Sequence, residues 1–298
     1  MRTCPLFAKL AALVLALALT LSCSDDKDDG SDPNLGVGSS SSDGNLSGLS
    51  SSSGVNNSSS SSRAGSSSSS VVINIVYGAD VDYGNETYKT VVIGEQTWFQ
   101  RNLNYEPSGT GVATNSKCYN DEPSKCTQYG RLYDWATAMK LPASCNSDTC
   151  ADQVQPKHQG ICLSGWHIPS NADWDQLMRS VDGTSGTSSP YYSPTAGRYL
   201  KATSDWSNSC GVGSSYSFQC EDKYGFSALP GGYANYDGDF ISVSYFGRWW
   251  SASEDELFVL AGTFSYAYYR GMGFSDEKVN GTSIRKDDGL FSVRCVKD

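Results

Sequence analysis

The sequence predicts an α+β fold: a loop-rich, disulfide-stapled domain in which two helices pack on a twisted antiparallel sheet. Three observations lead to this prediction. Segments rich in β-branched and aromatic residues lie at both ends of residues 71–298, two segments between them carry apolar residues at helical spacing, and eight of the 10 cysteines follow residue 100. A stretch of this length suffices for one sizeable hydrophobic core.

The N-terminus predicts export. Arg2 and Lys9 flank the start of an apolar run, 10–21, that is too short to span a bilayer and fits a secretory signal. Residues 1–22 are therefore interpreted as a lipoprotein signal peptide and Cys23 as the lipidated cysteine, although Thr20 stands where such signals usually carry leucine. The alternative is a plain secretory signal that is cleaved elsewhere.

The segment that follows Cys23 predicts a tether. Four aspartates between residues 25 and 29 resemble the surface-export signal of bacterial lipoproteins, and the alternative is a charged linker. Residues 24–70 are mostly Ser, Gly, Asp and Asn, so they have little to bury and are expected to be disordered. Such a chain spans roughly 35–40 Å. We therefore expect an outer-membrane lipoprotein, exposed on the cell surface, with a lipidated tether at 23–70 and one domain at 71–298.

The domain opens with strand signals. Residues 71–77 are β-rich, and two β-rich arms within 88–100 flank Gly94-Glu95, a pair that suits a two-residue hairpin turn.

Two helices are expected next. In 130–140 the apolar residues have the spacing i, i+3, i+4, i+7, and the same spacing recurs after Pro169, at Trp174, Leu177, Met178 and Val181. Ser170 and Asp173 resemble a capping box, with Asp in place of the usual Glu. Residues 183–222 read as loop, and further strands are expected at 224–233, 247–253, 257–264 and 289–297.

The cysteines predict disulfides, because an even number in an exported domain favours them. Proximity pairs Cys118 with Cys126, Cys145 with Cys150 and Cys210 with Cys220, which leaves Cys162 for Cys295. A metal site at His158, Cys162 and His167 is the weaker alternative, since the chain has 2 histidines and no paired CxxC. We expect no metal and no cofactor.

No catalytic residue is expected. The chain lacks GxSxG, HExxH and a phosphate-binding glycine loop. Its carboxylates are numerous, but nothing singles out a glycosidase pair. The net charge of −10 argues against nucleic acid as a partner.

A recognition surface is the favoured role for the aromatic residues, of which 18 are tyrosines, many set among Gly, Ser and Asp. The alternative is that about half of them fill a core poor in Leu and Ile. Asp237-Gly-Asp239 suits a plain turn better than a calcium loop. The candidate ligand-binding residues are Tyr233, Tyr236, Asp237, Asp239, Trp249, Tyr266, Tyr268 and Tyr269.

A series of motifs resembles one family. The motifs, in order, are VVIGEQTW at 91–98, RNLN at 101–104, GRLYDW at 130–135, GICLSGWHIPS at 160–170, GFSALPGGY at 225–233, WSAS at 250–253 and FSVRCVK at 291–297. They resemble the Fibrobacter succinogenes major paralogous domain over nearly all of 85–298. The resemblance implies a C-type-lectin-like fold, distantly similar to formylglycine-generating enzymes, and its long disulfide agrees with Cys162–Cys295.

Departures from the related patterns limit the function. The Glu-Pro-Ser triplets at 106–108 and 122–124 lie too early for a calcium-type sugar site, and the surroundings of Cys210 and Cys220 do not match a formylglycine-generating enzyme. The favoured prediction is a non-enzymatic binding module at the cell surface for a polysaccharide or protein ligand. The alternatives are an enzyme on a formylglycine-generating or hydrolase scaffold, and a structural envelope component.

Overall fold

The computed structural model describes residues 74–182, 191–207, 219–256 and 264–298. These residues form an α+β domain with small antiparallel sheets, four α-helices and three disulfides that have both cysteines in the described ranges. The predicted α+β class is confirmed, and the expectation of two helices is wrong. No helix in the described ranges combines the length and the apolar character that a membrane span requires. The predicted signal and tether lie outside the described residues.

The first sheet has five strands in the order β1-β4-β5-β16-β8. The strands are β1 (Val76–Tyr77), β4 (Thr90–Ile93), β5 (Gln96–Phe99), β16 (Val296–Lys297) and β8 (Trp166–His167). β4 and β5 form the predicted hairpin, with Gly94-Glu95 between the paired residues Ile93 and Gln96. Val296 of β16 pairs with Trp98 on one side and His167 on the other, so the last strand completes the sheet.

The second sheet has four strands in the order β12-β13-β14-β9. They are β12 (Phe246–Glu254), β13 (Tyr266–Gly273), β14 (Val279–Arg285) and β9 (Tyr192–Ser193). β12 confirms the strand expected at 247–253, whereas most of the strand expected at 257–264 lies outside the described residues.

A third sheet has the order β11-β10-β15, with β11 (Phe240–Ile241), β10 (Tyr233–Asn235) and β15 (Gly289–Leu290). Two short pairs complete the strands: β2 (Val81–Tyr83) with β3 (Glu86–Tyr88), and β6 (Ser116–Lys117) with β7 (Leu132–Tyr133). The strand expected at 224–233 is wrong, because Gly225, Ser227 and Gly232 adopt positive φ of 72°, 53° and 68°, which breaks an extended run. The last expected strand, 289–297, is divided between β15 and β16.

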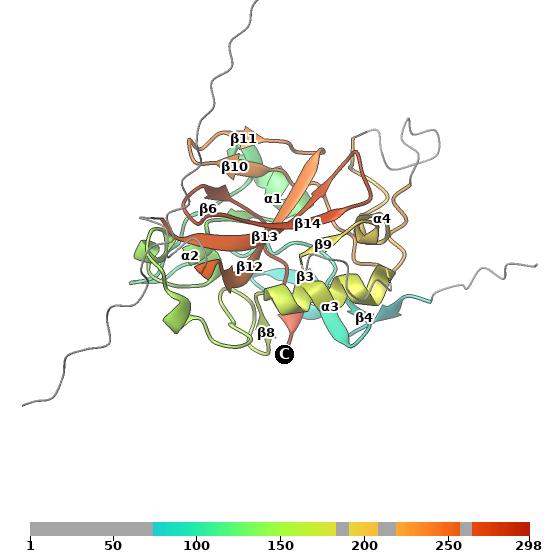
Figure 1. Cartoon of the computed structure of the whole chain (residues 1–298), viewed down its shortest axis with the longest axis horizontal. Helices are drawn as coiled ribbons and strands as arrows, with labels where there is room; N and C mark the ends of the chain where they lie inside the picture. Colours follow the sequence, from blue (N-terminus) through green and yellow to red (C-terminus); the bar gives the residue numbers. More distant parts are fainter. Residues whose placement is uncertain (1–73, 183–190, 208–218, 257–263) are drawn as a thin grey trace, which may run out of the picture. The chain divides into compact units, whose positions relative to one another are not determined.

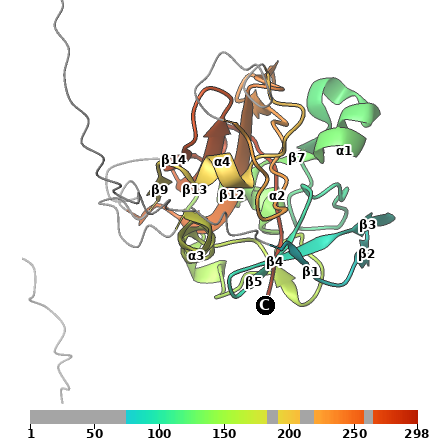
Figure 2. The same ribbon diagram turned by 90° about the vertical axis from the view of Figure 1, so that its right-hand side faces the viewer.

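The helix α3 (Asn171–Asp182) lies between the first and second sheets (Figure 1), and Figure 2 shows it nearly end-on with β4 to one side and β12–β14 above. It begins as predicted, since Asp173 Oδ2 accepts from the Ser170 backbone at 2.8 Å and from its hydroxyl at 2.6 Å. Its apolar face is fully buried, and Trp174 packs between Trp98 and Trp249 at ring distances of 5.1 and 6.5 Å. The interior between the sheets thus forms around α3.

The remaining helices are short. They are α1 (Pro123–Tyr129), α2 (Trp135–Ala138), α4 (Ala196–Leu200) and three 3-10 turns at Tyr119–Asp121, Ala143–Asn146 and Ala151–Gln153. The helix expected over 130–140 is reduced to α2. Gly130 ends α1 with a φ of 80°, β7 follows, and Asp134 caps α2 by accepting from the Thr137 backbone at 2.7 Å.

The disulfides follow the predicted pairing where both cysteines are described: Cys118–Cys126, Cys145–Cys150 and Cys162–Cys295. Cys220 is also disulfide-bonded. Its expected partner, Cys210, lies outside the described residues, so that pairing stays a prediction. The Cys162–Cys295 bridge connects residues just before β8 and β16, which are neighbours in the first sheet.

Among the described residues, four Lys and Arg side chains are fully buried, and each lies against an aromatic ring. Lys201 faces Trp206 at 4.9 Å, Arg270 faces Tyr191 at 5.3 Å, Lys286 faces Trp135 at 4.2 Å and Arg294 faces Phe226 at 4.5 Å. Each also donates to at least one oxygen atom, supplied by Gly273, Asp175, Glu254 and Asn102 respectively. Ring and oxygen together replace the hydration that burial removes.

Candidate functional site

The outer face of β10 is the centre of the candidate site. Along this strand Tyr233 and Asn235 are partly exposed, whereas Ala234 between them is 1% exposed and belongs to the core. Because side chains alternate along a strand, Tyr233 and Asn235 share one face, which is partly exposed. The face continues into the turn that joins β10 to β11, where Tyr236 is 72% exposed.

A cavity of about 280 Å³, here called the hairpin pocket, opens beside Asn235 and Tyr236. Its polar side chains come from five separate segments: Asn115, Lys117, Asp134, Asn146, Asn235, Tyr236 and Asp287. The side-chain oxygen atoms of two of these asparagines accept hydrogen bonds from the backbone, which fixes the amide groups. Asn146 accepts from Ala136 N–H and Asn235 from Asp239 N–H, both at 2.8 Å. Within the described residues their amide nitrogens have no hydrogen bond, so these donors are available to a ligand.

The phenol of Tyr236 is hydrogen-bonded to the neighbouring Asp237 carboxylate. The charge of the neighbouring Asp237 carboxylate raises the pKa of Tyr236, and a hydrogen bond to that carboxylate acts in the same direction. Asp237 and Asp239 are exposed residues of the turn. In the described ranges no group of three or more His, Cys, Asp or Glu residues is arranged to hold a metal ion. The geometry at Asp237 and Asp239 is that of a plain turn.

A second feature, here called the arginine cage, lies on the same face and consists of Arg248, Tyr233, Tyr269 and Phe291. The Arg248 guanidinium lies 3.6 Å from the Tyr233 ring centroid, 5.2 Å from that of Tyr269 and 5.3 Å from that of Phe291. The Tyr233 ring meets Phe291 edge-on at 6.0 Å. Rings on three segments therefore fix the position of one guanidinium.

Three of the predicted ligand residues do not belong to this face. Trp249 was expected to contact ligand, but it is 0% exposed and donates to Asn102 at 2.8 Å, because its place on β12 turns it toward α3. Tyr266 and Tyr268 alternate with Tyr269 on β13 and so lie on the opposite side of the sheet. Tyr268 packs against Tyr191 there, at 4.8 Å.

Sequence reasoning missed Arg248 and the three asparagines of the pocket. One signal was present for Arg248, since it stands two residues before Trp250 on a strand and therefore shares its face. No local pattern marks Asn115 or Asn146, which reach the pocket only through the tertiary fold.

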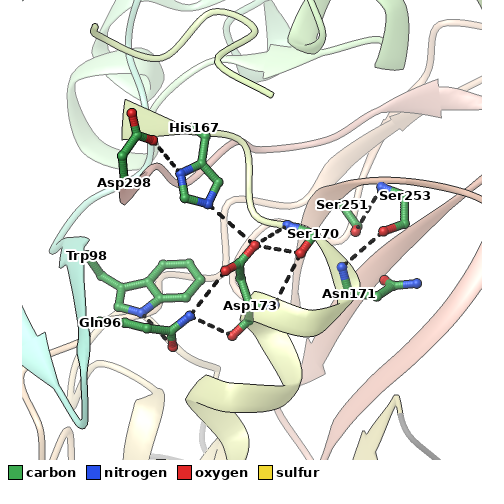
Figure 3. A network of polar contacts seen from close by, with 9 residues as sticks. All are labelled: Gln96, Trp98, His167, Ser170, Asn171, Asp173, Ser251, Ser253 and Asp298. Atoms are coloured by element: carbon green, nitrogen blue, oxygen red, sulfur yellow. Dashed lines mark hydrogen bonds and ion pairs between the residues drawn. The ribbon is translucent and has the colours of Figure 1, made fainter. Parts of the chain in front are cut away.

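A larger cavity of about 450 Å³ lies at the start of α3 and is lined in part by Ser170, Asp173, His158, Ser253 and Glu254. Figure 3 shows the polar network on one side of it. His167 Nδ1 lies 2.7 Å from Asp298 Oδ1, and its Nε2 lies 3.4 Å from Asp173 Oδ2. Asp173 also accepts from Ser170, while Asn171 donates to Ser253 at 3.1 Å.

This network secures the start of α3 and does not resemble a nucleophile with its base. Burial is the largest influence on Asp173 and raises its pKa, but hydrogen bonds from His167 and Ser170 outweigh it, so the pKa of Asp173 is lowered. A carboxylate with a lowered pKa is a weak base for the Ser170 hydroxyl that it accepts.

The histidines considered as metal ligands have structural partners. His158 contacts the Met139 carbonyl at 2.8 Å and the Gln155 backbone N–H at 3.2 Å, so both ring nitrogens are engaged. Cys162 is in its disulfide with Cys295. The three residues of the alternative metal site thus have other roles in the fold.

One comparison with known proteins is positive. The family model described as the Fibrobacter succinogenes major domain matches residues 91–297, more than half of the chain. No curated protein and no solved structure matches the chain. The expected C-type-lectin-like fold therefore stays a prediction.

Proposed function

We propose, for a chain that belongs to the Fibrobacter succinogenes major domain family, that the domain is a non-enzymatic binding module for glycans. The observation that carries the proposal is the hairpin pocket, in which amide groups and the exposed Tyr236 surround a cavity of about 280 Å³. Its size is near the lower end for small-molecule sites, which suits one sugar unit of a longer chain.

The chemistry of the pocket fits a polyhydroxylated ligand. Asn146 and Asn235 each present an amide nitrogen whose partner oxygen is already fixed. Such donors are oriented before a ligand arrives, which reduces the entropy cost of binding. Tyr236 adds a rigid ring with a hydroxyl group, a combination that gives large contact area at low entropic cost.

Two features favour binding over catalysis. Cys220 is disulfide-bonded, whereas a formylglycine-generating mechanism needs reactive thiols. A hydrolase needs a carboxylic acid with a raised pKa in its cleft, but the pKa of Asp173 at the larger cavity is lowered and Glu254 there is paired with Lys286 at 2.9 Å.

The proposed setting is the outer surface of the cell. A lipid on Cys23 would hold the protein to the outer membrane, and residues 24–70 would let the domain reach ligands away from the bilayer. A module that samples a volume from a fixed anchor suits an insoluble glycan, because its local concentration at the surface stays high.

The test compares two exposed tyrosines in the purified full chain. Tyr236→Ala should weaken retention on a glycan array and on insoluble polysaccharides about tenfold, the effect of losing roughly 1.4 kcal/mol of contact. Tyr245→Ala is the matched control, since Tyr245 is 46% exposed and packs on Phe274 outside the pocket. If the unaltered protein is retained on no glycan, a glycan ligand is ruled out and a protein ligand takes its place.

A further inference from the structure

We infer that Arg248 is a subsite for a carboxylate group, so that the glycan bound by this face is an acidic one that carries uronic acid units. The inference rests on the proposed glycan function and adds the substrate class.

Arg248 differs from the four buried cations in one respect. Lys201, Arg270, Lys286 and Arg294 each combine a ring with an oxygen acceptor. Arg248 contacts three rings, yet in the part of the chain that the structure describes its guanidinium has no hydrogen bond and no ion pair. Its five N–H donors therefore lack a protein acceptor there.

The rings also determine what a ligand can reach. A guanidinium that lies 3.6 Å from the Tyr233 centroid presents its π-face to that ring, which leaves the N–H groups at its edge. Arg248 is partly exposed, so part of this side chain meets solvent. The planar fork of N–H groups matches the two oxygens of a carboxylate. Because the three rings already restrict the side chain, it loses little further conformational freedom when a ligand binds.

The cage and the hairpin pocket can serve one ligand. Tyr233 of the cage and Asn235 of the pocket are two residues apart on the same face of β10, a distance of roughly 7 Å along the strand. An extended oligosaccharide can thus occupy the pocket with one unit and reach Arg248 with another.

The neighbouring charges favour spaced carboxylates over dense negative charge. Asp287 at the pocket is neutralised by Arg285, at 3.0 and 2.7 Å. Asp237 and Asp239 are exposed in the turn and repel anions. A polymer with one carboxylate per sugar can place a single group at Arg248, whereas a heavily sulfated polymer brings further charges toward the turn.

The experiment uses one polymer in two charge states. Binding of the purified full chain to polygalacturonate and to its methyl-esterified form is measured by calorimetry and affinity electrophoresis. Arg248→Gln should weaken binding to polygalacturonate at least tenfold and weaken binding to the ester much less. Arg248→Lys should recover little because it lacks the fork. Arg198→Gln is the matched control, since Arg198 lies beside the Tyr199 ring but is paired with Glu221 and Glu277, and it should change neither affinity.

Each other outcome overturns the inference. Equal binding of the two polymers, or polygalacturonate binding that survives Arg248→Gln in a variant whose thermal unfolding matches the parent, shows that Arg248 is no carboxylate subsite. If dextran sulfate binds more tightly than polygalacturonate, or if polyglutamate is the one polymer that binds, Arg248 recognises an anion other than a uronate. Binding of neutral glycans alone overturns this inference and keeps the proposed function, whereas binding of no glycan contradicts both.

Discussion

The side-chain oxygen of Asn102 lies 2.7 Å from a guanidinium nitrogen of Arg294, inside the domain and 192 residues apart in the chain. The same oxygen accepts from the Trp249 indole at 2.8 Å, and the Asn102 amide nitrogen donates to the Tyr129 carbonyl at 2.8 Å. Asn102 therefore connects the segments that carry Tyr129, Trp249 and Arg294. Its uncharged side-chain oxygen is an acceptor for the buried Arg294 guanidinium.

Replacing Asn102 should be costly. Asn102→Ala leaves the donors of Arg294 and Trp249 without their shared acceptor, and we expect the free energy of unfolding to fall by about 2–4 kcal/mol. Urea denaturation measures this. Asn104→Ala is the control, since Asn104 is only partly buried and donates to Glu86. Equal losses in the two variants would contradict the central role of Asn102.

Two cations adjacent in sequence should differ in their effect on stability. Lys286 pairs with Glu254 at 2.9 Å with side chains 0% and 2% exposed, whereas Arg285 pairs with Asp287 at 2.7 Å with side chains 36% and 39% exposed. Lys286→Met leaves a buried carboxylate unpaired and should cost about 3–5 kcal/mol. Arg285→Ala should cost less than about 1 kcal/mol. Thermal unfolding measures the loss of stability in each variant. Similar losses would contradict the larger contribution assigned to the buried Lys286–Glu254 pair.

The long disulfide should contribute more than a short one. Cys162–Cys295 joins residues 133 apart and Cys145–Cys150 residues 5 apart. Removing both cysteines of the long bridge should cost about 3 kcal/mol more than removing both of the short bridge, because the long bridge restricts the unfolded chain more. The two double alanine variants are compared in urea. A larger loss from the short bridge would show that the unfolded-chain model fails here.

Asp173 should stabilise the domain only while it is ionised. Because the pKa of Asp173 is lowered in the folded state, the folded protein releases its proton more readily than the unfolded chain, whose value is about 3.9. This contribution is complete well above pH 4 and is lost as pH falls through the folded-state pKa. At pH 7, Asp173→Asn should lower the unfolding free energy by about 1 kcal/mol, and the difference from the parent should shrink toward pH 2.

Asp152→Asn provides the control for that pH series, since Asp152 is an exposed residue of a 3-10 turn. Its difference from the parent should stay near zero throughout. If the difference in unfolding free energy between Asp173→Asn and the parent grows as pH falls, the assigned direction of the Asp173 pKa shift is wrong.

The anchor and the acidic cluster can be separated on cells. Cys23→Ala should release the protein from the membrane fraction, because the predicted lipidation site is then missing. Alanine at the four aspartates 25, 26, 28 and 29 should keep it in that fraction but protect it from external protease. Unchanged protease cleavage after the aspartate substitutions would mean that this cluster does not direct surface exposure.

The parts of the fold with local signals were predictable. The β4–β5 hairpin has its turn pair, and α3 has Pro169, the Ser170–Asp173 box and an apolar stripe, so sequence alone located both. The segment 224–233 has β-rich composition, but positive φ at Gly225 and Gly232 bends it, and composition does not report φ.

The candidate site was predictable only in its residue types. Tyr233, Tyr236 and Tyr269 were identified as exposed aromatic residues, and the burial of Trp249 was not. The arginine cage needs β10, β12, β13 and Phe291 to meet. The helix α1 begins inside the Cys118–Cys126 loop, where no periodic pattern marks a helix. Contacts between segments that are distant in the sequence produce no local pattern from which they could be predicted.

The place of β16 has a consequence for the order in which the chain can fold. Val296 fills the gap between β5 and β8, and Cys295 is the second half of the bridge to Cys162. Everything from residue 74 onward must therefore emerge before the first sheet can close. If the predicted export takes place, the first sheet and the Cys162–Cys295 bridge can form only after the last residues have left the channel.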